Sequence, residues 1–219
     1  MILAAGRGER MRPLTDHTPK PLLEVGGKPL IVWHIERLRQ AGIVDIVINI
    51  AHLGYRIPER LGDGSRWGVR IVYSDEQEEG GLETLGGIVK ALPLLGNEPF
   101  WVINGDVFCD YPVTPHCTLA EGIKAHLVLV ANPPHHPRGD FDLSEGRVLD
   151  RPRYTYAGIG VYDPSLFASV PQGKRPLAPL LREAMGRGEI SGEYYDGLWV
   201  DVGTPDRLSV LDRRLRVSR

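Results

Sequence analysis

The chain has few cysteines, no large excess of charge of either sign and no long hydrophobic run. Its two cysteines, Cys109 and Cys117, are too few for a disulfide framework and lack the C-x-x-C spacing of a metal site, which favours a reducing compartment. A formal net charge of −2 leaves no excess of basic residues for nucleic acid. No apolar run approaches the roughly 18 residues of a membrane span, and no leader-like segment precedes the first apolar run. We therefore expect a cytoplasmic protein without nucleic-acid or membrane partners.

Glycine and proline are, by contrast, abundant, with 26 and 18 copies among the 219 residues. Such a composition indicates many tight turns. The 42% of hydrophobic and 25% of charged residues are ordinary for a globular protein, and a chain of this length buries about 70% of its unfolded surface. No repeat, linker or low-complexity tract divides it. We expect a single domain over residues 1–219.

Short apolar segments alternate with amphipathic ones through the first half of the chain. Strands are expected at 1–5, 44–50, 69–73, 100–104 and 126–130, and helices at 29–40, 53–61 and 82–92, the last ended by Pro93. This alternation predicts a parallel sheet covered on both faces. In such sheets the functional site lies at the carboxyl ends of the strands, here at Ala5-Gly6, Asn49 and Gly105-Asp106.

The second half has a different pattern. A polar hairpin is expected at 141–148, followed by a strand at 154–162, a helix at 176–187, a strand at 198–202 and a closing helix at 205–215. We interpret the segment after about residue 130 as a small antiparallel elaboration of the α/β domain.

A glycine-rich turn, Gly6-Arg7-Gly8, follows the first expected strand directly. Glycines allow backbone N–H groups to point inward and form a concave anion site, although an ordinary strand–helix turn has the same composition. A dinucleotide fingerprint would need a third glycine at Met11, and the Gly-Lys-Ser/Thr of a Walker A loop is absent. Four cations on and after this turn favour a phosphate site: Arg7, Arg10, Arg12 and Lys20. The prolines on both sides of Lys20 are expected to hold it in extended backbone.

These motifs together resemble the signature of the sugar-1-phosphate nucleotidylyltransferases. The resemblance begins with Leu-Ala-Ala-Gly-x-Gly-x-Arg-Met-x-Pro-Leu-Thr and Pro-Lys-Pro-Leu, and extends through Gly86-Gly87, Asn104-Gly105-Asp106 and Trp-Val-Asp-Val-Gly-Thr-Pro at 199–205. It covers nearly the whole chain. It implies a Rossmann-like, mostly parallel sheet flanked by helices, of the GT-A-like nucleotidyltransferase type. Residues 1–130 would form the nucleotide-binding half, and 131–219 the sugar-binding half with the second metal ligand.

The resemblance also implies roles for individual residues. Asp106 and Asp201 would hold Mg²⁺, whose preferred ligands are oxygens, and Arg10 and Lys20 would be catalytic. A helix cap is the structural alternative for an aspartate at a strand end; it is weaker for Asp106, because Val107-Phe108 does not start a helix. The nucleotide would contact residues of the glycine-rich turn, of the segment before the Gly-Gly helix and of the third strand end. These are Ala5, Gly6, Arg7, Gly8, Lys20, Gly81, Glu83, Thr84 and Asn104.

The sugar site is expected on the second half, at Arg138, Gly139, Asp140 and Tyr156. Tyr156 stands where many relatives have asparagine, which disfavours a simple hexose. Within this family, the short chain and segment 132–143 resemble the members that act in peptidoglycan recycling, and this resemblance implies UTP and N-acetylmuramate α-1-phosphate as substrates. Arg138 or Arg153 would suit the lactyl carboxylate of that sugar.

The nucleobase segment departs from the family pattern, because Leu85 replaces the first glycine of the usual Leu-Glu-Thr-Gly-Gly-Gly, and a single methyl separates uridine from thymidine. GDP-mannose and dTDP-glucose synthesis are the alternatives within the family. Outside it are a metal-dependent glycosyltransferase, for which Asp106-Val107-Phe108 lacks Asp-x-Asp, and a non-catalytic nucleotide-sugar-sensing module. We expect a monomer that acts on small molecules.

Overall fold

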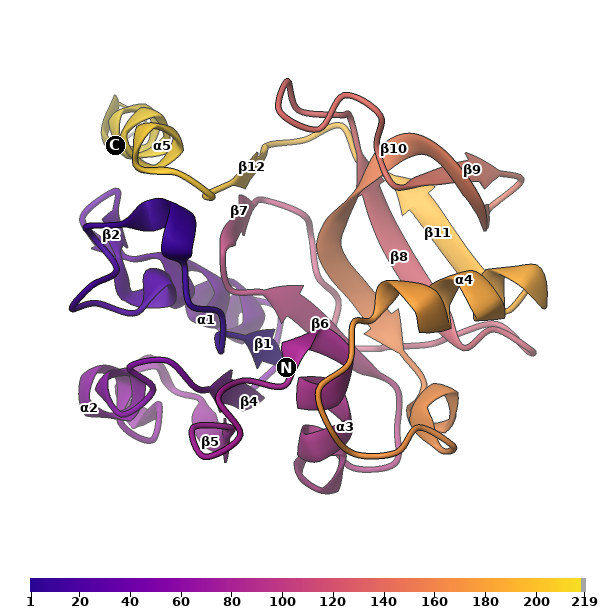
Figure 1. Cartoon of the computed structure of the whole chain (residues 1–219), viewed down its shortest axis with the longest axis horizontal. Helices are drawn as coiled ribbons and strands as arrows, with labels where there is room; N and C mark the ends of the chain where they lie inside the picture. The colour runs from indigo at the N-terminus through magenta and orange to yellow at the C-terminus, as the bar shows by residue number, and fades with distance from the viewer. Residues whose placement is uncertain (218–219) are drawn as a thin grey trace.

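A computed structural model describes residues 1–217. An eight-stranded sheet runs through the whole of it, in the order β11-β8-β10-β6-β1-β4-β5, with β9 paired to β10 (Figure 1). The strands are β1 (Ile2–Leu3), β4 (Asp45–Ile50), β5 (Arg70–Asp75), β6 (Phe100–Asn104), β8 (Ala125–Val130), β9 (Phe141–Ser144), β10 (Arg147–Tyr162) and β11 (Ile190–Tyr194). The helices are α1 (Leu30–Gln40), α2 (Arg56–Leu61), α3 (Glu83–Leu95), α4 (Ala178–Gly186) and α5 (Pro205–Val217). In the described part of the chain, no helix has the length and apolar character needed to cross a bilayer.

The first half confirms the expected α/β pattern. Strands β6, β1, β4 and β5 pair in parallel, and their residues are mostly buried because helices cover both faces. One core cluster lies under α3 and α4, and a second lies under α1 and α2. The carboxyl ends of the four strands therefore open at one edge of the sheet.

The second half extends the same sheet and has the antiparallel pairing that we expect after about residue 130. The expected hairpin and the strand after it share one continuous strand, β10, which pairs antiparallel with both β6 and β8. The sequence pattern does not predict strand β11, because Ile-Ser-Gly-Glu-Tyr has little apolar periodicity. It pairs in parallel with β8, so its place is set by the neighbouring strand and not by its own pattern.

Helix α3 continues past Pro93 to Leu95, so the prediction that Pro93 ends it is wrong. Proline removes a single backbone hydrogen bond in the last turn, where few bonds are left to lose. Leu92 and Leu95 pack against the same core cluster, and this contact holds the turn together. Gly96, with φ of 83°, follows the final residue.

Short two-stranded ribbons lie outside the main sheet. A two-stranded ribbon joins β7 (Val107–Cys109) to β12 (Trp199–Asp201), and a hairpin joins β2 (Glu24–Val25) to β3 (Lys28–Pro29). Figure 1 shows α5 and β12 beside the N-terminal segment. A third core cluster fills the space between them. Its buried members are Met11, Leu23, Val25, Leu30, Phe108, Val202 and Leu211. The packing of this cluster brings residues near positions 10, 106 and 201 to one place.

Candidate active site

A pocket of about 700 Å³ opens at the carboxyl ends of β1, β4 and β6, within the range of small-molecule sites. All nine residues that the sequence assigns to the nucleotide line it, as do Arg10 and Asp106. Further lining residues are Leu3, Ala4, Glu9, Met11, Pro21, Asn49, Gly80, Leu82, Lys174 and Gly203. The structure thus gathers segments near positions 5, 20, 82 and 105 around one cavity.

The glycine-rich turn forms one wall of this pocket. Gly8 has left-handed backbone (φ 63°) and starts the 3₁₀ turn Glu9–Met11, whose first bond runs from Met11 N–H to Gly8 O at 2.8 Å. A Cβ at Gly8 would lie 3.0 Å from Thr15 Cγ2 and 3.2 Å from Lys20 Cβ, so glycine is strongly favoured here.

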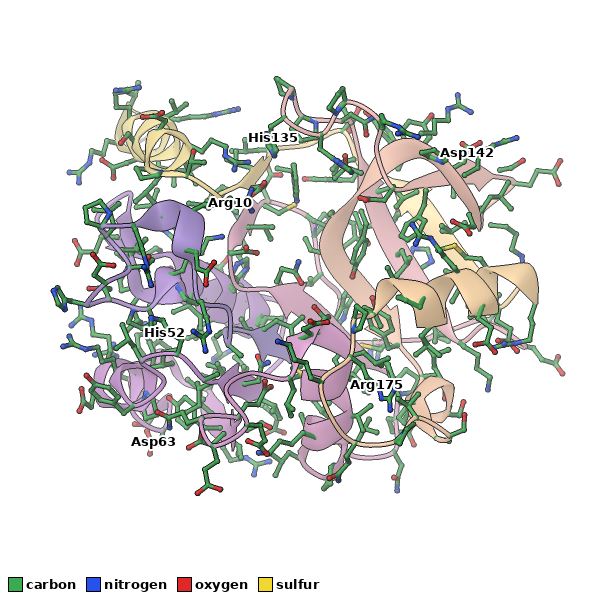
Figure 2. The ribbon with its side chains drawn as sticks, in the orientation of Figure 1. Arg10, His52, Asp63, His135, Asp142 and Arg175 are labelled. Atoms are coloured by element: carbon green, nitrogen blue, oxygen red, sulfur yellow. The ribbon has the colours of Figure 1, made fainter. Side chains whose placement is uncertain are left out.

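The cations of this turn do not all face the pocket. Arg7 and Arg10 are exposed on the turn and line the cavity. Arg12 instead pairs with Asp16, with Nε 3.4 Å from Oδ1, outside the pocket lining. In Figure 2, Arg10 and His135 lie on the same side of the molecule, next to β12. Three of the four predicted cations, Arg7, Arg10 and Lys20, therefore meet at the cavity.

Lys20 is nearly enclosed and aims at a single acid. Its side chain is 8% exposed, and Nζ lies 2.6 Å from Asp106 Oδ2. Pro19 is extended as expected, but Lys20 opens a 3₁₀ turn, with Leu23 N–H donating to Lys20 O at 3.1 Å. The expectation of extended backbone at Lys20 itself is therefore wrong. The turn is stabilised by its own hydrogen bonds and outweighs the preference of a residue that precedes proline.

Asp106 and Asp201 lie at adjacent ends of the β7–β12 ribbon. Asp201 is paired with Val107 in the ribbon, and Val202 N–H donates to Asp106 O at 3.0 Å. The Asp106 side chain is 41% exposed, whereas Asp201 Oδ2 accepts a hydrogen bond from Arg207 Nη1 at 2.5 Å and lies 2.8 Å from His135 Nε2. The ribbon pairing brings the two aspartates to one end of the ribbon; Asp106 lines the pocket, whereas Asp201 does not. Each carboxylate is paired with a cation, and a pair of carboxylates is a donor set that suits a hard divalent ion.

Fewer than three acidic or ligating side chains converge anywhere within residues 1–217, so protein atoms alone do not complete a coordination shell there. Mg²⁺ commonly binds through one or two carboxylates, with phosphate oxygens and water as its other ligands. Asp106 and Asp201 fit an ion of that kind.

A second wall of the pocket is formed by the segment before α3 and by the first residues of that helix. Gly81, Glu83 and Thr84 line it, and Glu83 has a left-handed backbone (φ 59°) that is unusual for a residue with a side chain. Lys174 reaches the same wall, with Nζ 4.0 Å from Glu83 Oε1. Sequence reasoning missed Lys174; the available signal is a pair of cations after a glycine, in Gly-Lys-Arg-Pro at 173–176.

The residues assigned to the sugar lie outside this pocket. Asp140 accepts a hydrogen bond from Tyr156 N–H at 2.9 Å, and its other carboxylate oxygen lies 3.0 Å from His136 Nε2. The Tyr156 hydroxyl bonds to the hydroxyl of Tyr162 at 2.8 Å, and burial raises the pKa of Tyr156 well above its usual value. Arg138 is exposed, and Gly139 N–H donates to His136 O at 3.3 Å.

The Tyr156 hydroxyl is thus turned into the core. Any sugar contact of this residue would involve its ring or its backbone.

His34 supports the ribbon from behind. It is 4% exposed, and Nε2 lies 2.8 Å from Val107 O, directly after Asp106. Burial lowers the pKa of His34 to about 4, so the ring is neutral at physiological pH and donates from Nε2. No local pattern indicates this role, because a histidine in a helix is as often packed as functional.

The comparisons with known proteins show that a chain with this fold is a nucleotidyltransferase. The family model described as "Nucleotidyl transferase" matches residues 1–216, and the chain belongs to this family.

N-acetylmuramate alpha-1-phosphate uridylyltransferase of Neisseria meningitidis serogroup B is 55% identical over 219 residues, covering 95% of this chain and 94% of that protein. The enzyme of the same name from Caulobacter vibrioides is 34% identical, over 98% and 96% of the two chains. A crystal structure from Bacillus anthracis, described as a glucose-1-phosphate thymidylyltransferase, superposes with a TM-score of 0.86. It covers 98% of this chain and 94% of that chain at 24% identity, which supports the fold alone.

Proposed function

We propose that this protein transfers UMP from UTP to N-acetylmuramate α-1-phosphate, giving UDP-N-acetylmuramate and pyrophosphate in peptidoglycan recycling. The observation that carries the proposal is the contact of Lys20 with Asp106 at the edge of a pocket lined by the glycine-rich turn. The choice of substrates is supported by the 55% identical relative, which matches along nearly its whole length.

The reaction follows from the charges at the site. A sugar 1-phosphate is largely dianionic near neutral pH, because its second pKa is about 6. One of its oxygens attacks the α-phosphorus of UTP, the bond from that phosphorus to the bridging oxygen breaks, and pyrophosphate leaves with the bond's electron pair. An ionised nucleophile needs no general base. Catalysis then consists of holding two polyanions in line and stabilising the charge that spreads over the phosphoryl group.

Each cation has a place in this scheme. In our proposal Lys20 lies between the α-phosphate and the incoming phosphate, and Arg10 neutralises the β- and γ-phosphates. Lys20 is enclosed and tied to one partner, which suits a cation that must act at a fixed point. Arg10 is exposed, which suits a cation that meets the more solvated end of the triphosphate.

We further propose that Asp106 and Asp201 hold Mg²⁺. The ion would supply positive charge to phosphate oxygens during the reaction. The carboxylates themselves are positioned by the β7–β12 ribbon, and Lys20 and Arg207 keep their charge balanced.

The base and the sugar occupy opposite sides of this centre in our proposal. The uracil would contact Ala5-Gly6 and the segment Gly81–Thr84, which belong to the two walls of the pocket. The sugar would extend toward the loop with Arg138, Gly139 and Asp140. Arg138 is exposed there and would meet the lactyl carboxylate, whereas Arg153, the other expected cation, pairs with Asp142 (Nη1 3.3 Å from Oδ1).

The test is a matrix of nucleoside triphosphates against sugar 1-phosphates, measured as pyrophosphate release with Mg²⁺. We expect the highest kcat/KM for UTP with N-acetylmuramate α-1-phosphate. If kcat/KM were highest for GTP with mannose 1-phosphate, or for dTTP with glucose 1-phosphate, the proposed reaction type would stand. The proposed substrates would then be replaced by that pair. Absence of release with every pair would instead support a nucleotide-sensing role. We also propose that the protein is a cytoplasmic monomer. Sedimentation of the same preparation measures its oligomeric state.

A further inference from the structure

Asn49, which lines the nucleotide pocket, and Glu76, which does not, form a buried polar pair. Asn49 is the penultimate residue of β4 and is 2% exposed, and Glu76 follows β5 directly and is completely buried. The amide Nδ2 of Asn49 donates to Glu76 Oε1 at 2.8 Å. A carboxylate is rarely buried without a functional or structural demand, because its desolvation is costly.

The pair connects the two walls of the pocket. On one side Ala4 N–H, at the start of the glycine-rich turn, donates to Asn49 Oδ1 at 2.8 Å. On the other side Leu82 N–H, directly before Glu83, donates to Glu76 Oε2 at 2.8 Å. A continuous chain of three hydrogen bonds therefore runs from one wall to the other, through the ends of β1, β4 and β5, which lie side by side (Figure 1).

The direction of every bond in this chain is fixed. Both outer partners are backbone N–H donors, so the side chains must present an acceptor to each. Asn49 must turn its oxygen to Ala4, which leaves its NH₂ for Glu76, and Glu76 must accept with both oxygens. Burial raises the pKa of Glu76, and the bonds from Asn49 and Leu82 act in the opposite direction and favour its ionised form.

The surroundings leave the pair no room to rearrange. A Cβ at Gly87 of α3 would lie 2.5 Å from Glu76 Oε1 and 2.8 Å from Asn49 Nδ2, so the helix backbone closes directly over the pair. Next to Leu82, Glu83 holds its left-handed backbone, a conformation that persists only when its surroundings impose it. Glu76 contributes to this, since Gly81 N–H also donates to Glu76 O at 3.2 Å.

We propose that Asn49 and Glu76 are positioning residues for nucleobase selection, because their bonds set the separation of the two pocket walls. This inference rests on the proposed function, in which the base contacts both of these walls. Neither side chain needs to touch the base. Their effect passes through the backbone of Ala4 and Leu82.

The test uses isosteric exchange of the two groups. In Glu76→Gln, an NH₂ group faces either Asn49 Nδ2 or Leu82 N–H, so one bond is lost. In Asn49→Asp, a carboxylate oxygen faces Glu76 Oε1, and two acceptors of like charge meet.

The double variant Asn49→Asp/Glu76→Gln restores the pattern with donor and acceptor exchanged between the two side chains. The new carboxylate at position 49 accepts from Ala4 N–H and from the new amide NH₂ at position 76. The amide oxygen at position 76 accepts from Leu82 N–H. All three bonds therefore return, and the total charge is unchanged.

We expect each single variant to raise the KM for UTP about 10-fold to 100-fold, the scale of one unsatisfied buried polar group. The preference for UTP over CTP should fall, while the KM for the sugar 1-phosphate stays within about twofold. The double variant should recover the KM for UTP to within about threefold. A matched control exchanges the neighbouring exposed pair, in which Gln77 Nε2 donates to Asp75 Oδ2 at 2.8 Å: Asp75→Asn/Gln77→Glu should change none of these values.

Two outcomes would overturn the inference. Single variants with a lowered melting temperature but unchanged UTP parameters would show a purely structural role. A double variant as impaired as the single ones would show that bond direction is not what matters. If wild type releases no pyrophosphate with any substrate pair, the proposed function fails. The inference is then judged separately by equilibrium dialysis of UTP and CTP, where the same pattern of loss and recovery is expected. Equal binding by all variants would reject it.

Discussion

Lys20 Nζ lies 2.6 Å from Asp106 Oδ2, although 86 positions separate the two residues in the chain. The lysine is almost enclosed and the aspartate is 41% exposed, so the ion pair presents its acidic end to the pocket. The ammonium is fixed by the surrounding turns, whereas the carboxylate has free surface for a second cation. This asymmetry suits a site at which Asp106 is shared between Lys20 and a bound cation.

Lys20→Ala should reduce kcat by about 10²-fold or more, because it removes a preorganised charge at the phosphoryl group. The measurement is pyrophosphate release under saturating UTP and sugar 1-phosphate. Lys124→Ala is the control, since Lys124 is bonded to Ser165, does not line this pocket and should leave kcat unchanged. Turnover of Lys20→Ala near that of wild type would reject its catalytic role.

Asp201→Asn should weaken the response to Mg²⁺ and lower activity by about 10²-fold, because an amide is a poorer ligand for a hard cation than a carboxylate. The quantity to measure is the Mg²⁺ concentration at half-maximal rate. Asp206→Asn serves as the matched control, since Asp206 is exposed in the first turn of α5. An unchanged Mg²⁺ dependence in Asp201→Asn would contradict the assignment.

Gly6→Ala and Gly8→Ala should fail in different ways. A Cβ at Gly6 meets no protein atom within 4 Å, so the variant should fold normally and raise the KM for UTP by at least about tenfold, because the methyl group occupies the pocket. Gly8→Ala should lose about 1–2 kcal/mol of unfolding free energy from its left-handed backbone, and more from contact with Thr15 and Lys20.

Urea titration and UTP kinetics of both variants separate these effects. Gly122→Ala, with φ of 76° and open space around its Cβ, isolates the backbone contribution. If Gly8→Ala and Gly122→Ala lowered the free energy of unfolding equally, the close contact at Gly8 would make no contribution to the loss.

The stability of the protein should fall in acid partly through His34. Its pKa is about 4 when folded and about 6.5 when unfolded, so between these values the unfolded chain binds more protons. Unfolding free energy therefore decreases as pH drops from about 6.5 to about 4, by about 3 kcal/mol in total from this group. Urea denaturation of wild type and His34→Gln over this range measures it. The variant should lack this component of the pH dependence, and parallel curves for the two proteins would exclude it.

The local patterns of the chain determine much of the fold. The apolar segments of β4 and β6 and the spacing of apolar residues in α1 and α5 predict these elements closely. A buried strand or helix face requires apolar residues at a regular period, and that period is visible in the sequence. The prediction failed at β11, which has no apolar pattern of its own, and at Pro93, where packing of Leu92 and Leu95 overrides a local helix breaker.

Motifs also located the candidate site, since Gly8, Lys20 and Asp106 stand in short segments with distinctive chemistry. The sequence by itself determined which side chains carry charge and which turns require glycine, because these properties are local. The tertiary structure alone decided that Lys20 meets Asp106, that Asp201 lies at the next strand's end, and that Glu76 joins the two pocket walls. These pairings depend on the order of the strands and on the packing of the third core cluster. Both result from contacts between residues far apart in the sequence, so no local pattern predicts them.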